Sequence, residues 1–129
     1  MSENADRIRA GFDAFQSGDV EGMLGNVAAD ALIERSEPDA GTWHGPQGLL
    51  EAVTDWVASF EEFDASVADV VENGDWAVAR IHQRATGKAS GARVEDDFWF
   101  AYEFADGKLA RLLMTSDRAH AYEVAGLSN

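Results

Sequence analysis

The spacing of apolar residues changes once along this chain, and that change constrains its fold more than any other feature. Up to Phe63, apolar residues recur at helical spacing in three segments, whereas beyond it they alternate with polar residues, as in half-buried strands. Helical segments followed by a run of strands predict an α+β fold. With 129 residues, the chain is expected to form one domain, residues 1–129.

Turn and capping residues set the boundaries of the expected elements. Asp19 and Asp117 are typical helix N-caps, and Asn73-Gly74-Asp75 is typical of a hairpin turn. The expected elements are helices over residues 6–17, 20–27, 45–60 and 118–124, and strands over residues 31–36, 66–72, 76–86, 93–104 and 109–116. Short turns join the late strands, so we expect them to pair antiparallel.

Strand alternation predicts which side chains face the helices. The inward set of the strand at 93–104 is aromatic, whereas that of the strand at 76–86 is small and largely apolar. The inward set of the last strand is Ala110, Leu112, Met114 and Ser116. Small side chains opposite Trp56 and Phe60 of the third helix favour a cavity, although those two side chains are also large enough to fill it.

Composition and charge exclude several classes of function. The net charge of −14 repels nucleic acid and anionic lipid, so we expect neither a nucleic-acid nor a membrane partner. The chain has no cysteine, which excludes disulfides, thiolate nucleophiles and cysteine-ligated metal sites. No apolar run approaches the roughly 20 residues of a spanning helix, and the N-terminal residues lack a secretory apolar segment. We therefore expect a cytoplasmic protein.

The outward face of the predicted sheet mixes charged and apolar side chains. Its charged members are Arg80, Arg84, Arg111, Asp97 and Glu103. Opposite charges on neighbouring strands are expected to pair, and Trp99 and Leu113 add apolar area. A mixed, partly aromatic face is typical of subunit interfaces, so we expect a homodimer through it; an ordinary solvated sheet face is the alternative.

Several short motifs occur in the order and spacing of one known family. They are Phe12-x2-Phe15-x2-Gly18-Asp19, Trp43-His44-Gly45, Gly74-Asp75, Phe104-Ala105-Asp106-Gly107-Lys108-Leu109, Asp117-Arg118 and Ala125-Gly126-Leu127. With them the chain resembles the SnoaL-like branch of the nuclear transport factor 2-like superfamily over nearly its whole length. The resemblance implies a cone-shaped, strongly curved antiparallel sheet wrapped around three N-terminal helices and an apolar pocket, with a short C-terminal helix.

The resemblance also implies a ligand class, a polyketide, terpenoid or steroid-like compound, and for an enzyme it implies cofactor-free isomerisation, cyclisation or hydrolysis. The catalytic carboxylates of known branches are replaced here. Aligned with isomerase-like members, the base position is Arg35 and the oxyanion-binding Asp position is Phe100. Aligned with epoxide hydrolase-like members, the catalytic positions are Ile81, Gln83 and Met114. Because a fold does not decide function, a non-catalytic ligand carrier or a dimeric interaction module stays open.

The candidate site residues combine the implied pocket with the remaining polar groups. Arg35 would polarise a ligand oxygen, and His44, Glu37 or Asp117 would move a proton. Alternatively, Arg35 pairs with Glu37 or turns to solvent, and Asp117 only caps its helix. The candidate ligand-binding residues are Phe15, Glu37, Trp56, Phe60, Ile81, Gln83, Phe98, Phe100, Tyr102, Leu112, Met114 and Ser116. The three histidines show no metal-ligand spacing, so neither a metal nor a cofactor is expected.

Overall fold

The structure, a computed structural model, describes residues 3–36 and 40–128. The helices within these residues are α1 (Glu3–Ser17), α2 (Val20–Leu24), α3 (Gly45–Val57) and α4 (Arg118–Val124). The strands are β1 (Val27–Arg35), β2 (Gly41–His44), β3 (Phe60–Asn73), β4 (Trp76–Gly87), β5 (Arg93–Ala105) and β6 (Lys108–Thr115). None of the described helices is long and apolar enough to cross a membrane.

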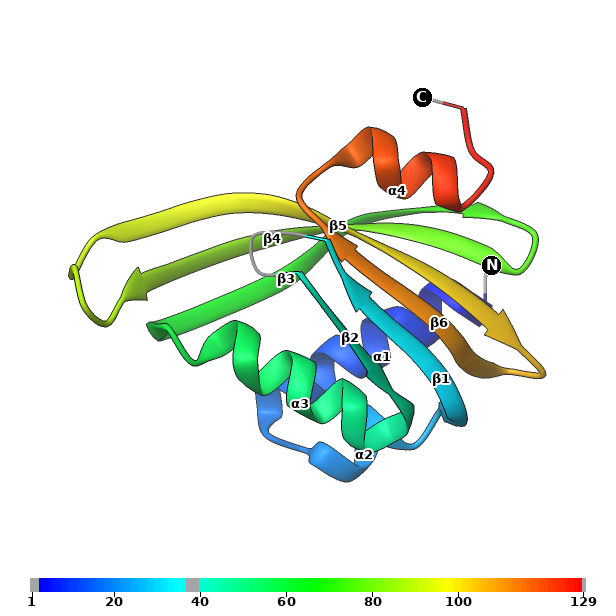
Figure 1. Ribbon diagram of the computed structural model, residues 1–129, viewed down its shortest axis with the longest axis horizontal. Helices are drawn as coiled ribbons and strands as arrows, with labels where there is room; N and C mark the ends of the chain where they lie inside the picture. Colours follow the sequence, from blue (N-terminus) through cyan, green and yellow to red (C-terminus); the bar gives the residue numbers. More distant parts are fainter. Residues whose placement is uncertain (1–2, 37–39, 129) are drawn as a thin grey trace.

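The strands form one curved sheet in the order β2-β1-β6-β5-β4-β3. Helices α1, α2 and α3 lie against one face of this sheet, and α4 lies on the other face (Figure 1). The predicted α+β class, with a curved sheet, N-terminal helices and a short C-terminal helix, is therefore confirmed. One feature differs from the expectation: β1 runs parallel to β6, so the sheet is mixed rather than wholly antiparallel.

Several boundaries differ from the expected elements. Val27 begins β1 instead of ending the second helix, and α3 ends at Val57, so that Phe60 begins β3. Near Phe60 the apolar spacing fits a helix and a strand equally well. In the structure Phe60 pairs with Gly87 of β4 and therefore belongs to a strand. Strand β2 was not expected at all. It is only four residues long and pairs with β1, and such a short strand has too few residues to show alternation.

A β-bulge changes one predicted face of β6. The register of β5 and β6 shifts between Glu103 and Phe104, so that Phe104 pairs with Leu109 and Glu103 with Arg111. The extra residue, Ala110, reverses the alternation at this end of the strand. Leu109 therefore joins the inner core in place of the predicted Ala110, whereas the predicted inward positions of Leu112 and Met114 are confirmed.

The two faces of the sheet carry separate apolar clusters. The inner cluster, beneath α1, α2 and α3, contains the predicted aromatic stripe of β5 and the small residues of β4. The outer cluster is small and lies under α4, where Val78, Ala101 and Leu113 pack against Ala121 and Ala125. Asn73 ties this helix to the β3–β4 turn, because its side-chain amide donates to the carbonyl of Ala125 at 2.9 Å. Helix α4 thus covers part of the face predicted to be a subunit interface.

Candidate functional site

An apolar cavity of about 90 Å³ lies between the N-terminal helices and the inner face of the sheet. Six of the candidate ligand-binding residues line it: Phe15, Trp56, Phe100, Tyr102, Leu112 and Met114. They come from α1, α3, β5 and β6, so the cavity depends on the packing of the whole fold and not on one motif. Whether these residues bind a ligand stays a prediction.

Helix α1 supplies one wall of the cavity through a single face. Ile8, Gly11, Phe12 and Phe15 all line the cavity, and their spacing of three and four residues places them on one side of a helix. At Gly11, an added Cβ would meet no heavy atom within 4 Å. The absence of a side chain at this position therefore leaves part of the cavity open.

Trp56 of α3 lines the cavity next to Phe100 and also forms a hydrogen bond with Gln83. Its indole N–H donates to Oε1 of Gln83 at 2.9 Å, and Gln83 is only 1% exposed. This bond occupies the amide oxygen of Gln83, a residue that was expected to contact a ligand. Gln83, Ile81, Phe60 and Phe98 pack near the cavity or in the core around it, but the structure does not place them on its wall.

Tyr102 is one of the few polar residues on the wall of the apolar cavity. The residue is 8% exposed, lines the cavity and makes no hydrogen bond to any part of the chain that the structure describes. Its ring stacks on Phe104 with centroids 5.9 Å apart and contacts Phe100 at 6.3 Å. Burial raises the pKa of Tyr102 above its usual value, so the hydroxyl stays protonated and can donate a hydrogen bond.

The cavity opens toward solvent beside Arg7 and Asn26, which sequence reasoning missed. Both line the cavity, Asn26 is exposed, and the Arg7 side chain is 27% exposed. The guanidinium of Arg7 lies over the ring of Phe104 and donates to Oδ1 of Asn4 at 2.7 Å. Arg7 lies one turn of α1 before Gly11, and this spacing is the signal that could have identified it.

Arg35 is buried, but it does not line the cavity. Its guanidinium pairs with the carboxylate of Asp55 in α3, donates to the carbonyl of Ala52 at 3.4 Å, and lies 5.0 Å from the centre of the Trp43 ring. The alternative in which Arg35 turns to solvent is therefore wrong. Glu37, the other predicted partner, lies outside the described residues.

The other two candidate catalytic residues lie at helix N-termini outside the cavity. His44 is exposed at the N-cap of α3, and its side chain makes no capping bond. Asp117 caps α4 by accepting from the backbone N–H of His120 at 3.3 Å, which agrees with the structural alternative for this residue. Ser116 precedes Asp117 and is exposed. The structure thus does not bring Arg35, His44 and Asp117 together at the cavity.

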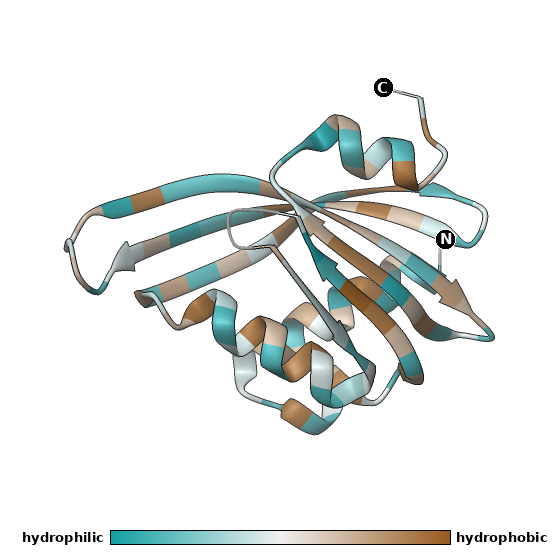
Figure 2. Ribbon diagram, viewed as in Figure 1, coloured by the Kyte–Doolittle hydropathy of each residue, from teal (hydrophilic) through white to brown (hydrophobic). Residues whose placement is uncertain are grey.

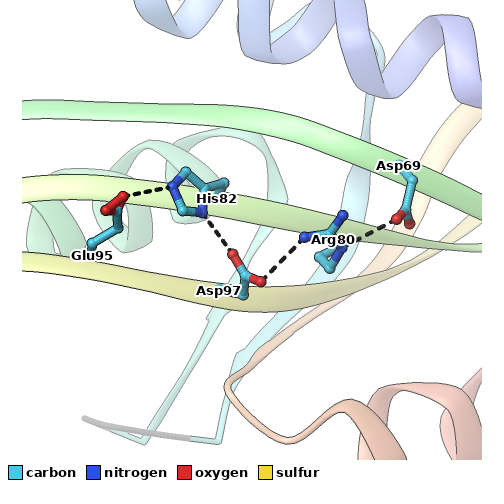
Figure 3. Close-up of polar contacts among 5 residues, drawn as sticks. All are labelled: Asp69, Arg80, His82, Glu95 and Asp97. Atoms are coloured by element: carbon cyan, nitrogen blue, oxygen red, sulfur yellow. Dashed lines mark hydrogen bonds and ion pairs between the residues drawn. The ribbon is translucent and has the colours of Figure 1, made fainter.

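Charged side chains form a network on the outer face of β3, β4 and β5 (Figure 3). Asp97 lies between Arg80, at 3.2 Å, and His82, at 2.8 Å, and these two also contact Asp69 and Glu95. The predicted Arg80–Asp97 pair is therefore present.

Near the β4–β5 loop, β5 is mostly hydrophilic (Figure 2). The homodimer through this face stays a prediction, which sedimentation showing only a 14.0 kDa species would contradict.

Arg111 shows why outer-face pairs depend on strand order. Its expected partners were the outward carboxylates of β5, Asp97 and Glu103, but its guanidinium instead contacts Glu34 of β1 at 3.0 Å. Strand β1 lies beside β6 in the sheet, on the side away from β5. The sequence pattern did not reveal this neighbour, because β1 reaches β6 only through a parallel pairing between distant segments.

The His82–Asp97 contact predicts how stability depends on pH. Hydrogen bonding to Asp97 raises the pKa of His82 above 6.5, and the same bond lowers the pKa of Asp97. The charged His82 therefore stabilises the fold fully below about pH 6.5, and this contribution is lost as pH rises through the raised pKa. Thermal unfolding should show that the stability deficit of His82→Gln, relative to wild type, shrinks between about pH 6 and about pH 9.

A control for this pH dependence is His120→Gln, which removes an exposed imidazole on α4. This variant should keep the pH dependence of stability that the His82–Asp97 contact produces. A His82→Gln deficit that is constant with pH would contradict the assigned pairing.

Comparison with known proteins agrees with this architecture. A model of the SnoaL-like domain matches residues 8–112, and a search of curated protein sequences finds no match. An NTF2-like protein of unknown function from Burkholderia pseudomallei is 22% identical, with 97% of this chain and 98% of that chain covered and a TM-score of 0.79. TerC, co-crystallised with polyporic acid, is 23% identical, with 97% and 99% covered and a TM-score of 0.79.

A third similar structure has a higher sequence identity. A loop-truncation variant of IdmH is 28% identical to this chain, with 85% of this chain and 89% of that chain covered and a TM-score of 0.70. The family match covers most of the chain, including α1 and the strands that line the cavity. This chain therefore belongs to the SnoaL-like domain family.

Proposed function

We propose that the protein binds a small, mostly apolar organic molecule, such as a polyketide, terpenoid or steroid-like compound, in the cavity beneath α1. The observation that carries this proposal is an apolar cavity whose wall includes Tyr102, a residue whose hydroxyl makes no hydrogen bond to the described part of the chain. Ligand sites typically combine an apolar lining with a few polar groups in this way. The co-crystal of TerC with polyporic acid supports the proposal, because TerC shares this fold.

The size of the cavity limits how such a ligand would sit. A volume of about 90 Å³ holds a single ring more readily than a polycyclic compound. We propose that one end of the ligand fills the cavity and that the remainder extends past Arg7 and Asn26. Those two polar side chains lie at the opening, where a more polar part of the ligand would meet solvent.

Binding without a reaction fits the lining better than catalysis does. Isomerisation, cyclisation or hydrolysis without a cofactor needs a group that takes up a proton. No carboxylate or imidazole lines the cavity among the described residues, where the polar side chains are those of Arg7, Asn26 and Tyr102. Arg35, His44 and Asp117 lie elsewhere. A ligand carrier is therefore the form of the proposal that we favour.

Filling the cavity from α1 tests this proposal. Gly11→Leu should place a side chain in the open space beside Phe12 and abolish binding. In a thermal-shift screen of apolar ketones and epoxides, the wild-type protein should be stabilised by about 2.7 kcal/mol at a ligand concentration of about 100 times Kd. Gly11→Leu should show no such stabilisation by the same compounds.

The matched control is Gly11→Ala, which adds one methyl group to the same helix position. It should stabilise the free protein by about 0.5–1 kcal/mol, because alanine favours a helix interior more than glycine does, and it should still bind the compounds. The proposal is wrong if no apolar compound shifts the wild-type protein, or if Gly11→Leu binds as well as Gly11→Ala.

A further inference from the structure

The hydroxyl of Tyr102 differs from the other polar groups near the cavity. The indole N–H of Trp56 has a partner in Gln83 at 2.9 Å, whereas no hydrogen bond joins the Tyr102 hydroxyl to residues 3–36 and 40–128. Among these residues no fully buried side-chain oxygen or nitrogen lacks a partner, so this hydroxyl is accessible although the residue is only 8% exposed. A ligand oxygen in the cavity would supply an acceptor that the described residues do not offer.

The surroundings hold this hydroxyl in one place. Strand pairing sets Tyr102 between Ala77 of β4 and Leu112 of β6, neither of which offers a side-chain acceptor. The ring lies parallel to that of Phe104, with an angle of 3° between the two planes, and also contacts Phe100. A donor fixed in this way needs no reorganisation when a ligand arrives, which favours specific recognition.

We infer that Tyr102 is the specificity-determining residue of the cavity, and that it selects ligands whose polar group is a carbonyl oxygen over the corresponding alcohols. A carbonyl oxygen accepts the hydrogen bond of Tyr102 and brings no donor of its own. The inference rests on the proposed function, because it assumes that an apolar ligand enters the cavity.

The discrimination against alcohols follows from the rest of the lining. An alcohol that accepts from Tyr102 brings a second O–H donor into the cavity. The other polar side chains among the described lining residues are Arg7, which is a donor only, and Asn26, which is exposed at the opening. One hydroxyl hydrogen would therefore remain unpaired in an apolar space, which weakens binding of the alcohol.

Three probes of nearly equal shape test the inference: acetophenone, α-methylbenzyl alcohol and ethylbenzene. They carry a carbonyl oxygen, a hydroxyl group and no polar group on the same single-ring body. Calorimetric titration of the wild-type protein should show that acetophenone binds roughly threefold to tenfold more tightly than either other probe. Tyr102→Phe should remove this preference and leave the affinity for ethylbenzene unchanged within about twofold.

Tyr122→Phe is the matched control, because it removes the same atom from α4 on the other face of the sheet. It should keep the preference for acetophenone. Circular dichroism should confirm that both variants fold. If Tyr102→Phe does not fold, the comparison of the three probes on the wild-type protein decides, because an alcohol that binds as tightly as the ketone overturns the inference.

The outcomes separate this inference from the proposed function. Binding of all three probes with equal affinity would overturn the role of Tyr102 and leave ligand binding in the cavity intact. A preference for acetophenone that persists in Tyr102→Phe would also overturn it, because another group would then be the donor. Failure of the wild-type protein to bind any of the three probes would contradict both proposals.

Discussion

Replacing Trp56 by alanine is expected to cost about 3–5 kcal/mol of unfolding free energy. The ring contacts four others, those of Phe15, Phe63, Phe98 and Phe100, at centroid distances from 4.9 to 6.3 Å. It therefore joins α1, β3 and β5 to α3. Denaturant unfolding of the wild type and the variant measures the loss, and a cost below about 1 kcal/mol would contradict this role.

Trp56→Phe separates the hydrogen bond of Trp56 from its packing. Phenylalanine keeps an aromatic ring at this position but lacks the N–H that donates to Gln83. The acceptor of Gln83 would then be buried and unpaired, at a cost of about 1–3 kcal/mol. Trp76→Phe, at a half-buried position packed against the outer cluster, is the matched control and should cost less.

The second large effect is expected at Arg35. Arg35→Ala should cost about 3–5 kcal/mol, because it removes the cation over Trp43 and the partner of Asp55 and leaves a space at a buried position. Asp55→Ala should cost less, about 1–2 kcal/mol, since the Asp55 side chain is 57% exposed and water can partly replace it. Equilibrium unfolding of both variants measures the two costs.

The same variants distinguish a structural Arg35 from a ligand-binding one. Arg35→Met keeps most of the side-chain volume and should recover part of the stability lost in Arg35→Ala. Because Arg35 does not line the cavity, Arg35→Met should bind acetophenone as the wild type does. A variant with wild-type stability and a large loss of affinity would instead place Arg35 at the ligand.

Alternation predicted the inner faces of the long strands, because one buried face repeats with a period of two residues. The aromatic stripe of β5 and the inward positions of Leu112 and Met114 follow from it. The pattern failed where the backbone departs from regular pleating, as at the bulge that turns Leu109 inward. Phe60 was placed in the wrong element because it lies where a helix ends and a strand begins.

The cavity wall was partly predictable, whereas polar partners were not. Six of the candidate ligand-binding residues line the cavity. They could be predicted because the alternation of strand faces and the family resemblance both indicated them. The partner of Arg35 depends instead on how α3 packs over β1, and Asp55 lies 20 residues away in sequence. The open space at Gly11 was also not predictable, because the lack of a side chain leaves no pattern of its own.

The central claim is that an apolar space beneath α1 admits a guest, and diffraction from crystals under xenon pressure tests it most directly. Xenon enters apolar cavities without needing a particular chemical group. We predict a xenon atom among Phe12, Leu112, Met114 and the open side of Gly11, and no xenon at that place in Gly11→Leu. Wild-type crystals without xenon at this place would contradict the account.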